Sequence, residues 1–287
     1  MRTEKAMYDL ILDYARRDPR VRVVGLVGSR AHPNAPRDNF QDYDITFLVR
    51  DLDSFRSSET WLDYFGPRVI TQKPNAMRHP EPGSENELVY LMLFEDGNRI
   101  DLSISPVETL PGYLASDRMM VILLDKDGLV GDLPVPTDRD YWIQPPDAKA
   151  YDDCSNEFWW VNPYVAKGLA RDEILYAAWH LERCVRVELL TMLGWKVGCE
   201  VGFKRSLGKQ YKYLQPYLSP EEWSLLKRTY RLDTAGNVWQ ALFAAQALFR
   251  LSAKRVAEAL GFDYPPYDGK VSAYVQIISA QYRLGVD

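Results

Sequence analysis

Residues 21–50 read VRVVGLVGSRAHPNAPRDNFQDYDITFLVR and decide the fold. The apolar run at 21–28 predicts a strand that ends in Gly28-Ser29, and the run at 43–50 predicts a second strand beginning beside Asp42-Tyr43-Asp44. Side chains two residues apart on a strand project from the same face, so Asp42 and Asp44 point together. Two such carboxylates repel each other unless a cation lies between them, and oxygen ligands suit Mg²⁺. This stretch therefore predicts a sheet with a metal site at its strand ends.

Two further features extend this predicted site. Gly28 allows a tight backbone turn, and its N–H together with Ser29 can hold a phosphate group. In the run 99–104, polar and apolar residues alternate, which places Asp101 on the polar face of another strand. If that strand pairs beside 43–50, three carboxylates converge. Such a set is typical of two-metal phosphoryl or nucleotidyl transfer, in which the ions lie about 3.5–4 Å apart.

The remainder of the first half predicts a mixed sheet with flanking helices. Apolar spacing predicts a helix over 3–17 and another over 53–65. Further strands are predicted at 88–94 and 119–124, and the turn Glu95-Asp96-Gly97-Asn98 predicts a β-hairpin between 88–94 and 99–104. The segment 66–87 is rich in proline, glycine and charge, which favours a loop.

The second half predicts an all-α bundle. Glycine and proline are dense over 128–148, so the domain boundary is expected there, with a first domain at 1–135, a linker at 136–148 and a second domain at 149–287. Helices are predicted over three ranges of this second domain: 171–193, 220–232 and 237–261. The fold class is therefore α+β: a mixed sheet with flanking helices, followed by a helical bundle.

Composition limits the possible functions. The 287 residues carry a net charge of −5, which argues against a nucleic-acid partner because binding to phosphate backbones needs excess Lys and Arg. Residues 1–145 hold 17 Lys and Arg against 24 Asp and Glu, while 146–287 hold 18 against 16. The 3 cysteines form no CxxC pair, and no signal sequence or run of 18 apolar residues occurs. We therefore expect a cytoplasmic protein without a membrane partner.

The wording of several motifs resembles one family. The sequence reads GSR at 28–30, FQDYDI at 40–45, WLDYFG at 61–66, RIDL at 99–102, NEFWWV at 156–161 and LGKQYKYL at 207–214. These motifs resemble the aminoglycoside 6-adenylyltransferases, which inactivate streptomycin and share the nucleotidyltransferase superfold. The resemblance implies transfer of AMP from ATP to a hydroxyl, the 6-position of the streptidine ring of streptomycin, with release of pyrophosphate.

By this resemblance, Asp42, Asp44 and Asp101 would be catalytic and would hold two Mg²⁺ ions. Asp101 would be either a metal ligand or the general base, and the sequence does not choose between these roles. The ATP triphosphate would bind Gly28, Ser29 and Arg30. The chain departs from many members of the superfold at Pro33 and Pro36, which interrupt the small-residue helical turn that follows Gly-Ser and affect the phosphate contacts predicted for 30–36.

The second half offers partners for both substrates. Basic residues gather in 201–231 and suit the β- and γ-phosphates, with Lys209 and then Lys204 as the first candidates. Streptomycin carries two guanidinium groups, so its site should offer carboxylates and aromatic faces. Candidates for this role are Asp153, Glu157, Trp160 and Glu182. One tryptophan of the Trp159-Trp160 pair is expected in the core, and an ion pair with a nearby arginine at helical spacing is the alternative for Glu182.

Other functions remain open from the sequence. The chain could modify a different hydroxyl acceptor, including a protein side chain, or it could be an inactive nucleotide- or drug-binding protein with the same fold. The glycines at 202 and 208 and Gln210 after Lys209 do not match the spacing of a P-loop. The oligomeric state is not indicated.

Overall fold

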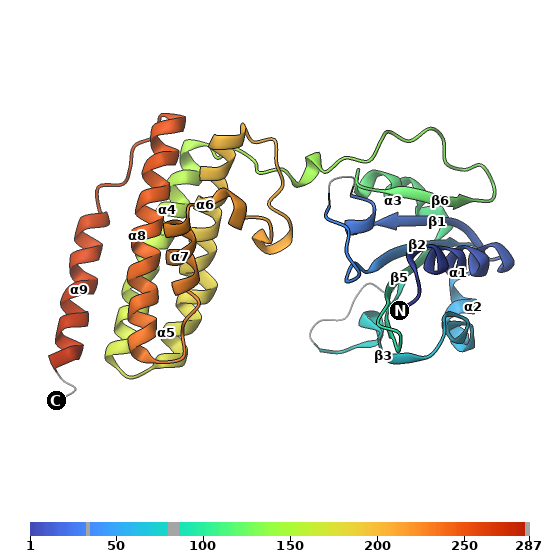
Figure 1. Cartoon of the computed structure of the whole chain (residues 1–287), viewed down its shortest axis with the longest axis horizontal. Coiled ribbons are helices and arrows are strands. Elements are labelled where there is room, and N and C mark those ends of the chain that lie inside the picture. The colour runs from blue at the N-terminus through green and yellow to red at the C-terminus, as the bar shows by residue number, and fades with distance from the viewer. Residues whose placement is uncertain (33–34, 80–85, 285–287) are drawn as a thin grey trace. The chain divides into compact units, whose positions relative to one another are not determined.

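The structure is a computed structural model that describes residues 1–32, 35–79 and 86–284. The chain divides into two compact units, Met1–Asp140 and Tyr141–Asp287 (Figure 1). Each unit has its own buried core. The division falls inside the segment 136–148, and the mixed sheet followed by helices confirms the predicted α+β class.

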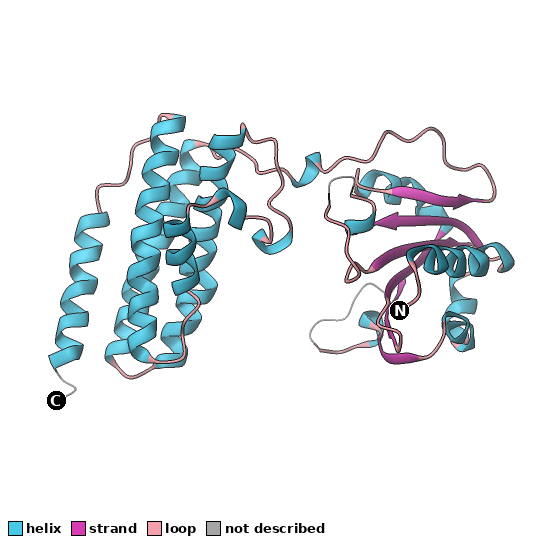
Figure 2. Cartoon of the chain, viewed as in Figure 1, coloured by secondary structure: helices cyan, strands magenta, loops and turns pink. Residues whose placement is uncertain are grey.

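Among the described residues of the first unit, six strands form one mixed sheet in the spatial order β3-β4-β5-β2-β1-β6 (Figure 2). β2 and β5 run parallel, and the other neighbouring pairs run antiparallel. The strands span Val21–Val27 (β1), Tyr43–Val49 (β2), Arg68–Gln72 (β3), Leu88–Phe94 (β4), Arg99–Pro106 (β5) and Val121–Asp125 (β6). All five predicted strands are therefore confirmed, as is the β4–β5 hairpin, in which the Phe94 N–H donates to the Asn98 carbonyl at 2.9 Å.

Helix α1 (Glu4–Arg17) covers one face of this sheet. Thr3 caps it by accepting a hydrogen bond from the Ala6 N–H at 3.2 Å. Its buried residues Met7 and Ile11 belong to the same core as the β2 side chains Tyr43, Ile45, Phe47 and Val49. Those β2 residues alternate with Asp44, so burial of this face directs Asp44 to the opposite one.

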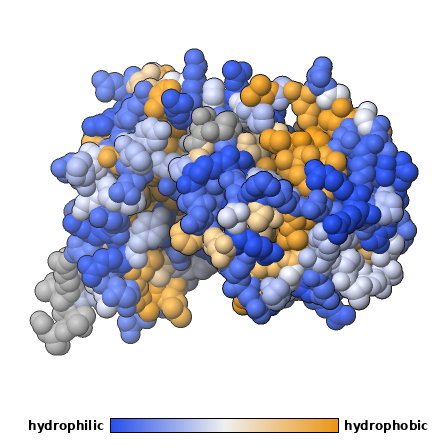
Figure 3. Space-filling model, turned by 45° about the vertical axis from the view of Figure 1, so that its right-hand side comes forward, coloured by the Kyte–Doolittle hydropathy of each residue, from blue (hydrophilic) through white to orange (hydrophobic). Residues whose placement is uncertain are grey.

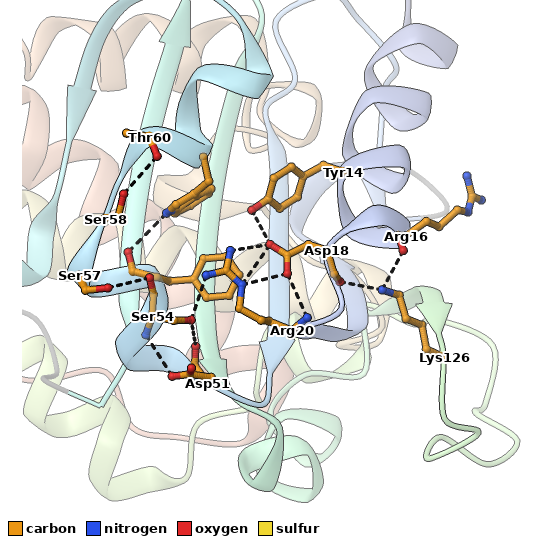
Figure 4. A network of polar contacts seen from close by, with 12 residues as sticks. Tyr14, Arg16, Asp18, Arg20, Asp51, Ser54, Ser57, Ser58, Thr60 and Lys126 are labelled. Atoms are coloured by element: carbon orange, nitrogen blue, oxygen red, sulfur yellow. Dashed lines mark hydrogen bonds and ion pairs between the residues drawn. The ribbon is translucent and has the colours of Figure 1, made fainter.

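A polar network joins the C-terminal end of α1 to the beginning of β1 and to α2 (Leu52–Ser57) (Figure 4). The Tyr14 hydroxyl donates to Asp18 at 2.9 Å, and both carboxylate oxygens of Asp18 accept hydrogen bonds from the Arg20 guanidinium. Arg20 also donates to the Ser54 hydroxyl at 2.9 Å and lies over the Phe55 ring. These contacts fix the position at which β1 enters the sheet.

The opposite face is partly covered by α3 (Leu110–Ser116). Leu110, with Tyr113 and Leu114 beside it, packs on Val23 and Leu48 of β1 and β2. A Cβ atom at Gly25 would lie 2.0 Å from the Tyr113 hydroxyl oxygen, so β1 needs a glycine where α3 approaches it. Asp44 and Asp101 belong to this face, farther along β2 and β5.

Two predictions for the first unit are wrong. The helix predicted over 53–65 is interrupted, because α2 ends at Ser57 and a separate 3₁₀ helix spans Thr60–Phe65. Ser58 is extended, and the Ser57 and Ser58 hydroxyls bond to local groups that compete with helix continuation. The segment 66–87, predicted as a loop, contains strand β3. Val69 and Ile70 of this strand are both 63% exposed. Because neither face of β3 is buried, its sequence lacks the alternation of apolar and polar residues that would have predicted a strand.

Six α-helices form the second unit in the described part of the chain. They are α4 (Ala148–Ala170), α5 (Ile174–His180), α6 (Arg186–Val201), α7 (Pro220–Arg228), α8 (Ala235–Leu260) and α9 (Asp268–Leu284). Helices α7 and α8 confirm two predictions. The helix predicted over 171–193 is confirmed in position but begins later, because Asp172 turns the chain with a φ of 61°. It runs without a break from Ile174 to Val201 as α5, a π-helical turn at Leu181–Val185, and α6.

The bundle core is aromatic at its centre. Phe158 of α4 stacks on Phe249 of α8 with ring centroids 3.8 Å apart, and Trp159 meets both rings edge-on. On the face drawn in Figure 3, hydrophobic residues reach the surface in groups between hydrophilic ones. Among the described residues, no helix is both long enough and apolar enough to cross a membrane.

Candidate functional site

The register of β2 and β5 brings the predicted carboxylates to adjacent strands. Asp44 lies opposite Asp101, and Asp42 directly precedes β2. This pairing confirms that the strand bearing Asp101 lies beside the strand bearing Asp44. Because neighbouring side chains in register share a face, the two carboxylates lie on the face that α1 leaves uncovered.

Gly28 closes one side of this arrangement. It has a φ of +72°, and a Cβ atom there would lie 2.1 Å from Asp44 Oδ2. The Asp44 carboxylate therefore rests against the glycine backbone, at the start of the short 3₁₀ turn Gly28–Arg30. The Ser29 carbonyl accepts a hydrogen bond from the Gln41 side chain at 3.3 Å, which links the two motifs.

Arg30 connects the turn that begins at Gly28 to the backbone just before β2. It is 7% exposed, and its guanidinium donates to the Asp42 carbonyl at 3.1 Å and to the Gln41 carbonyl at 2.8 Å. It also lies 3.8 Å from the Tyr43 ring centroid and donates to Glu4. Arg30 was predicted to bind the nucleotide. In this structure its guanidinium instead bonds to protein groups and holds the backbone that carries Asp42. Pro33, which bears on the phosphate contacts predicted for 30–36, lies outside the described residues.

Arg99 was missed by sequence reasoning and is central to the site. Its guanidinium makes a bidentate contact with Asp101, both bonds at 2.7 Å, and lies 3.6 Å from Asp42 Oδ2. The signal was present in the sequence, because Arg99 and Asp101 are two residues apart on a strand and share a face. Burial and the neighbouring charge of Asp101 raise the pKa of Asp42, while Arg99 opposes this shift.

The donor chemistry of this cluster fits a hard cation. Asp42, Asp44 and Asp101 offer only carboxylate oxygens, and burial raises the pKa of Asp42, which disfavours its ionised form. Arg99 supplies a positive partner for Asp42 and Asp101 in this structure. Within residues 1–32, 35–79 and 86–284, no three His, Cys, Asp or Glu side chains are grouped closely enough to hold a metal ion as they stand.

The basic candidates lie in the second unit. Lys204 and Lys209 are both exposed on the segment between α6 and α7. Lys209 follows Gly208, and the next two residues, Gln210 and Tyr211, have φ values of 55° and 59°. Non-glycine residues rarely adopt this backbone conformation, so the segment around Lys209 has a defined and unusual shape.

The predicted drug-binding residues also lie in the second unit. Trp160 is 62% exposed and donates to the Tyr164 hydroxyl at 3.0 Å, whereas Trp159 is fully buried, as expected for one of the pair. Glu157 is exposed, and Asp153 forms an ion pair with Lys149. The Glu182 carboxylate is exposed and lies 3.6 Å from Arg186 one helical turn later.

Glu188 is a further carboxylate that the sequence did not single out. It lies half-buried on α6, and burial, followed by a smaller effect of Glu157, raises its pKa. Burial, and then the charges of Glu157 and Glu188, raise the pKa of Cys184. Glu157 belongs to α4 and Glu188 to α6, so each of these helices carries an acidic residue that affects this thiol.

Comparisons with known proteins all match this chain to one family. The sequence profile of the streptomycin adenylyltransferase family matches residues 1–278. The aminoglycoside 6-adenylyltransferase of Bacillus subtilis is 45% identical over 277 residues, 96% of this chain and 98% of that protein. That of Campylobacter jejuni is 46% identical over 275 residues, 96% and 95% of the two chains. A crystal structure of an aminoglycoside 6-adenyltransferase from Bacillus subtilis covers 97% of this chain and 99% of its own, at 41% identity and a TM-score of 0.48.

Proposed function

Because the chain belongs to the streptomycin adenylyltransferase family, we propose that it transfers AMP from ATP to a hydroxyl of an aminoglycoside. The observation that carries this proposal is the register of Asp44 opposite Asp101, with Asp44 resting on Gly28. We take streptomycin as the acceptor and the 6-hydroxyl of its streptidine ring as the modified position. The family profile and the names of the relatives support this choice.

The reaction forms one bond and breaks another. The acceptor oxygen bonds to the α-phosphorus of ATP, the bond from that phosphorus to the α–β bridging oxygen breaks, and pyrophosphate leaves. Gly28 and Ser29 would hold the triphosphate, with Lys209 and Lys204 as partners of its outer phosphates. Asp101 would either accept the hydroxyl proton or hold a cation.

Asp42, Asp44 and Asp101 would hold Mg²⁺, and two ions fit the proposal. When bound, such ions neutralise charge on the departing pyrophosphate and make the acceptor hydroxyl more acidic. Arg99 would then have to release the carboxylates that it contacts here. Arg30 would keep Asp42 in place from below through the backbone.

The second unit would recognise the cationic drug. Asp153, Glu157 and Glu182 supply carboxylates for guanidinium groups, and the exposed face of Trp160 can stack on a planar cation. Glu188 adds to the negative charge near Glu157.

Mass spectrometry tests the proposal directly. The protein is incubated with ATP, Mg²⁺ and streptomycin, and we expect an AMP-sized increase in the mass of the drug together with release of pyrophosphate. A panel of other aminoglycosides and hydroxyl compounds defines the acceptor range. Binding of ATP and drug without pyrophosphate release would instead support an inactive binding protein, and absence of any adduct across the panel would refute the activity.

A further inference from the structure

A groove of about 690 Å³ lies on the sheet beside the carboxylates. Its lining includes Leu91 and Leu93 of β4 and Ile70 of β3, and it ends at Arg99. Leu91 pairs with Asp101, Leu93 pairs with Arg99, and Ile70 pairs with Leu93. Because residues directly opposite each other on paired strands share a face, the groove continues the face that bears Asp44 and Asp101.

The strand order places this groove on a defined side of the reaction centre. Gly28 and Ser29 follow β1, the carboxylates lie at β2 and β5, and the groove lies over β4 and β3 beyond them. Neighbouring strands are about 4.8 Å apart, so β1 and β3 lie on opposite sides of the carboxylate-bearing strands. β1 is roughly 5–10 Å from them and β3 roughly 10–14 Å.

In nucleotidyl transfer the attacking and departing oxygens lie in line, on opposite sides of the phosphorus. If Gly28 and Ser29 hold the triphosphate, pyrophosphate departs toward β1. The attacking hydroxyl must then approach from the side of β5, β4 and β3. We propose that the groove over β3 and β4 is the subsite for the acceptor, a hydroxylated ring that bears cationic groups. This inference rests on the proposed function.

The groove chemistry agrees with such a ligand. Leu91, Leu93 and Ile70 give an aliphatic surface for the C–H face of a ring, and the amide of Gln72 can bond to hydroxyls. Two cations also line the groove, but each already faces acids: Lys73 forms an ion pair with Glu59, and Arg99 contacts Asp101 and Asp42. The positive charge of Lys73 is therefore compensated by Glu59 when a cationic acceptor enters.

The sequence offers a matched pair of positions for a test. Ile70 and Val69 are neighbours on the edge strand β3 and are equally exposed, at 63%. Ile70 lines the groove and Val69 does not. Substitutions at these positions therefore carry similar folding consequences, and only those at Ile70 change the charge of the groove.

The experiment compares Ile70→Lys and Ile70→Glu with Val69→Lys and Val69→Glu in steady-state kinetics. We expect Ile70→Lys to raise the KM for streptomycin about tenfold through like-charge repulsion, and Ile70→Glu to lower it. The KM for ATP should stay within about twofold, and added salt should reduce both changes because it screens exposed charges. Both Val69 variants should match the unmodified protein.

Three outcomes would overturn the inference. Equal KM values for the Ile70 and Val69 pairs would show that the acceptor does not use the groove. A change confined to the KM for ATP would assign the groove to the nucleotide base. A KM for streptomycin that changes in the same direction for Lys and Glu would point to distortion instead of charge. Failure of the unmodified protein to adenylylate any acceptor would refute the proposed function itself, which these kinetics distinguish from failure of the groove alone.

Discussion

At the scale of single residues, Gly28 illustrates how backbone and site depend on each other. Its positive φ and its contact with Asp44 are separate requirements. Gly128 offers a control, because it has a φ of +64° and an added Cβ atom there would meet no atom of the described residues within 4 Å. We expect Gly28→Ala and Gly128→Ala each to lose about 1 kcal/mol of unfolding free energy from the left-handed conformation. Only Gly28→Ala should also lose adenylylation activity, because its methyl group displaces the Asp44 carboxylate.

Urea unfolding and steady-state kinetics on both variants check this expectation. Full activity in Gly28→Ala would show that the position of Asp44 beside the glycine is not needed for turnover.

Arg30 makes a second prediction at this scale. Its guanidinium bridges the carbonyls of Gln41 and Asp42, and lysine cannot reproduce this fork. We expect Arg30→Lys to lower kcat roughly 10- to 100-fold by misplacing Asp42, and to raise the Mg²⁺ concentration needed for half-maximal rate. Arg37→Lys is the control, because Arg37 is about half exposed and reaches Glu4 only at 4.0 Å. An unchanged Mg²⁺ requirement in Arg30→Lys would contradict a role for Arg30 in positioning Asp42.

The ionised carboxylate of Asp42 is expected to support turnover and, at the same time, to lower the stability of the fold. Burial and the charge of Asp101 raise its pKa in the folded chain, so the ionised carboxylate destabilises the fold at pH values above its ordinary pKa, near 4. This penalty vanishes at lower pH, where the group is protonated in both states. Asp42→Asn should therefore match or exceed the parent Tm at pH 7, match it near pH 3, and reduce turnover at least about 100-fold.

Thermal unfolding at both pH values and a turnover assay test this prediction. A Tm at pH 7 well below that of the parent would show that Asp42 stabilises the fold through Arg99.

At the scale of secondary-structure elements, one buried carboxylate joins the beginning of α9 to α8 and to the segment between them. Asp268 accepts hydrogen bonds from Arg250, Tyr264 and Ser272. Burial alone would raise the pKa of Asp268, but these partners outweigh it and lower the pKa. Asp268 therefore stabilises the fold at pH values above its unfolded pKa, and this contribution is lost as the pH falls through the folded pKa.

We expect Asp268→Asn to cost about 1.5–3 kcal/mol of unfolding free energy at pH 7, and progressively less in strong acid. Asp263→Asn, at an exposed position just before it, should cost little. Denaturant melts at pH 7 and at acid pH measure both effects. A cost for Asp268→Asn that does not change with pH would show that packing, and not charge, holds α9.

The elements differ in how well the sequence predicts them, and burial explains the difference. β1, β2 and β5 have sequence patterns that burial imposes, so the strands themselves were predicted. Their patterns do not determine which strands pair, and the parallel pairing that sets Asp44 beside Asp101 comes from the structure. β3 is an exposed edge strand, so its sequence carries no such pattern. Helix α4 contains Pro163 and mixes aromatic with acidic residues, and α9 is weakly amphipathic, so neither was predicted.

The same limit applies to the site. Strand periodicity places Asp42, Asp44 and Asp101 on one face, but it does not show which cation meets them. The bidentate contact from Arg99 and the buried position of Arg30 depend on side-chain packing that only the folded chain reveals. The groove over β3 and β4 was invisible for a similar reason, because β3 itself was not predicted.

At the scale of the whole molecule, each of the two units supplies different groups to the proposed reaction. The first unit holds the carboxylates and the phosphate turn, and the second holds Lys209 and the proposed drug-binding carboxylates. Each has its own hydrophobic core, so we expect the fragments 1–140 and 141–287 to fold separately, with cooperative thermal transitions and the secondary structure of the parent. Neither fragment alone should adenylylate streptomycin at more than about a thousandth of the parent rate. The first lacks Lys209 and the proposed drug-binding carboxylates, and the second lacks the phosphate turn and the carboxylates at β2 and β5. Circular dichroism measures the folding of each fragment, and the mass-spectrometric assay measures transfer by each fragment and by an equimolar mixture of the two. Parent-level transfer by 1–140 alone would show that the helical unit is dispensable for both substrates.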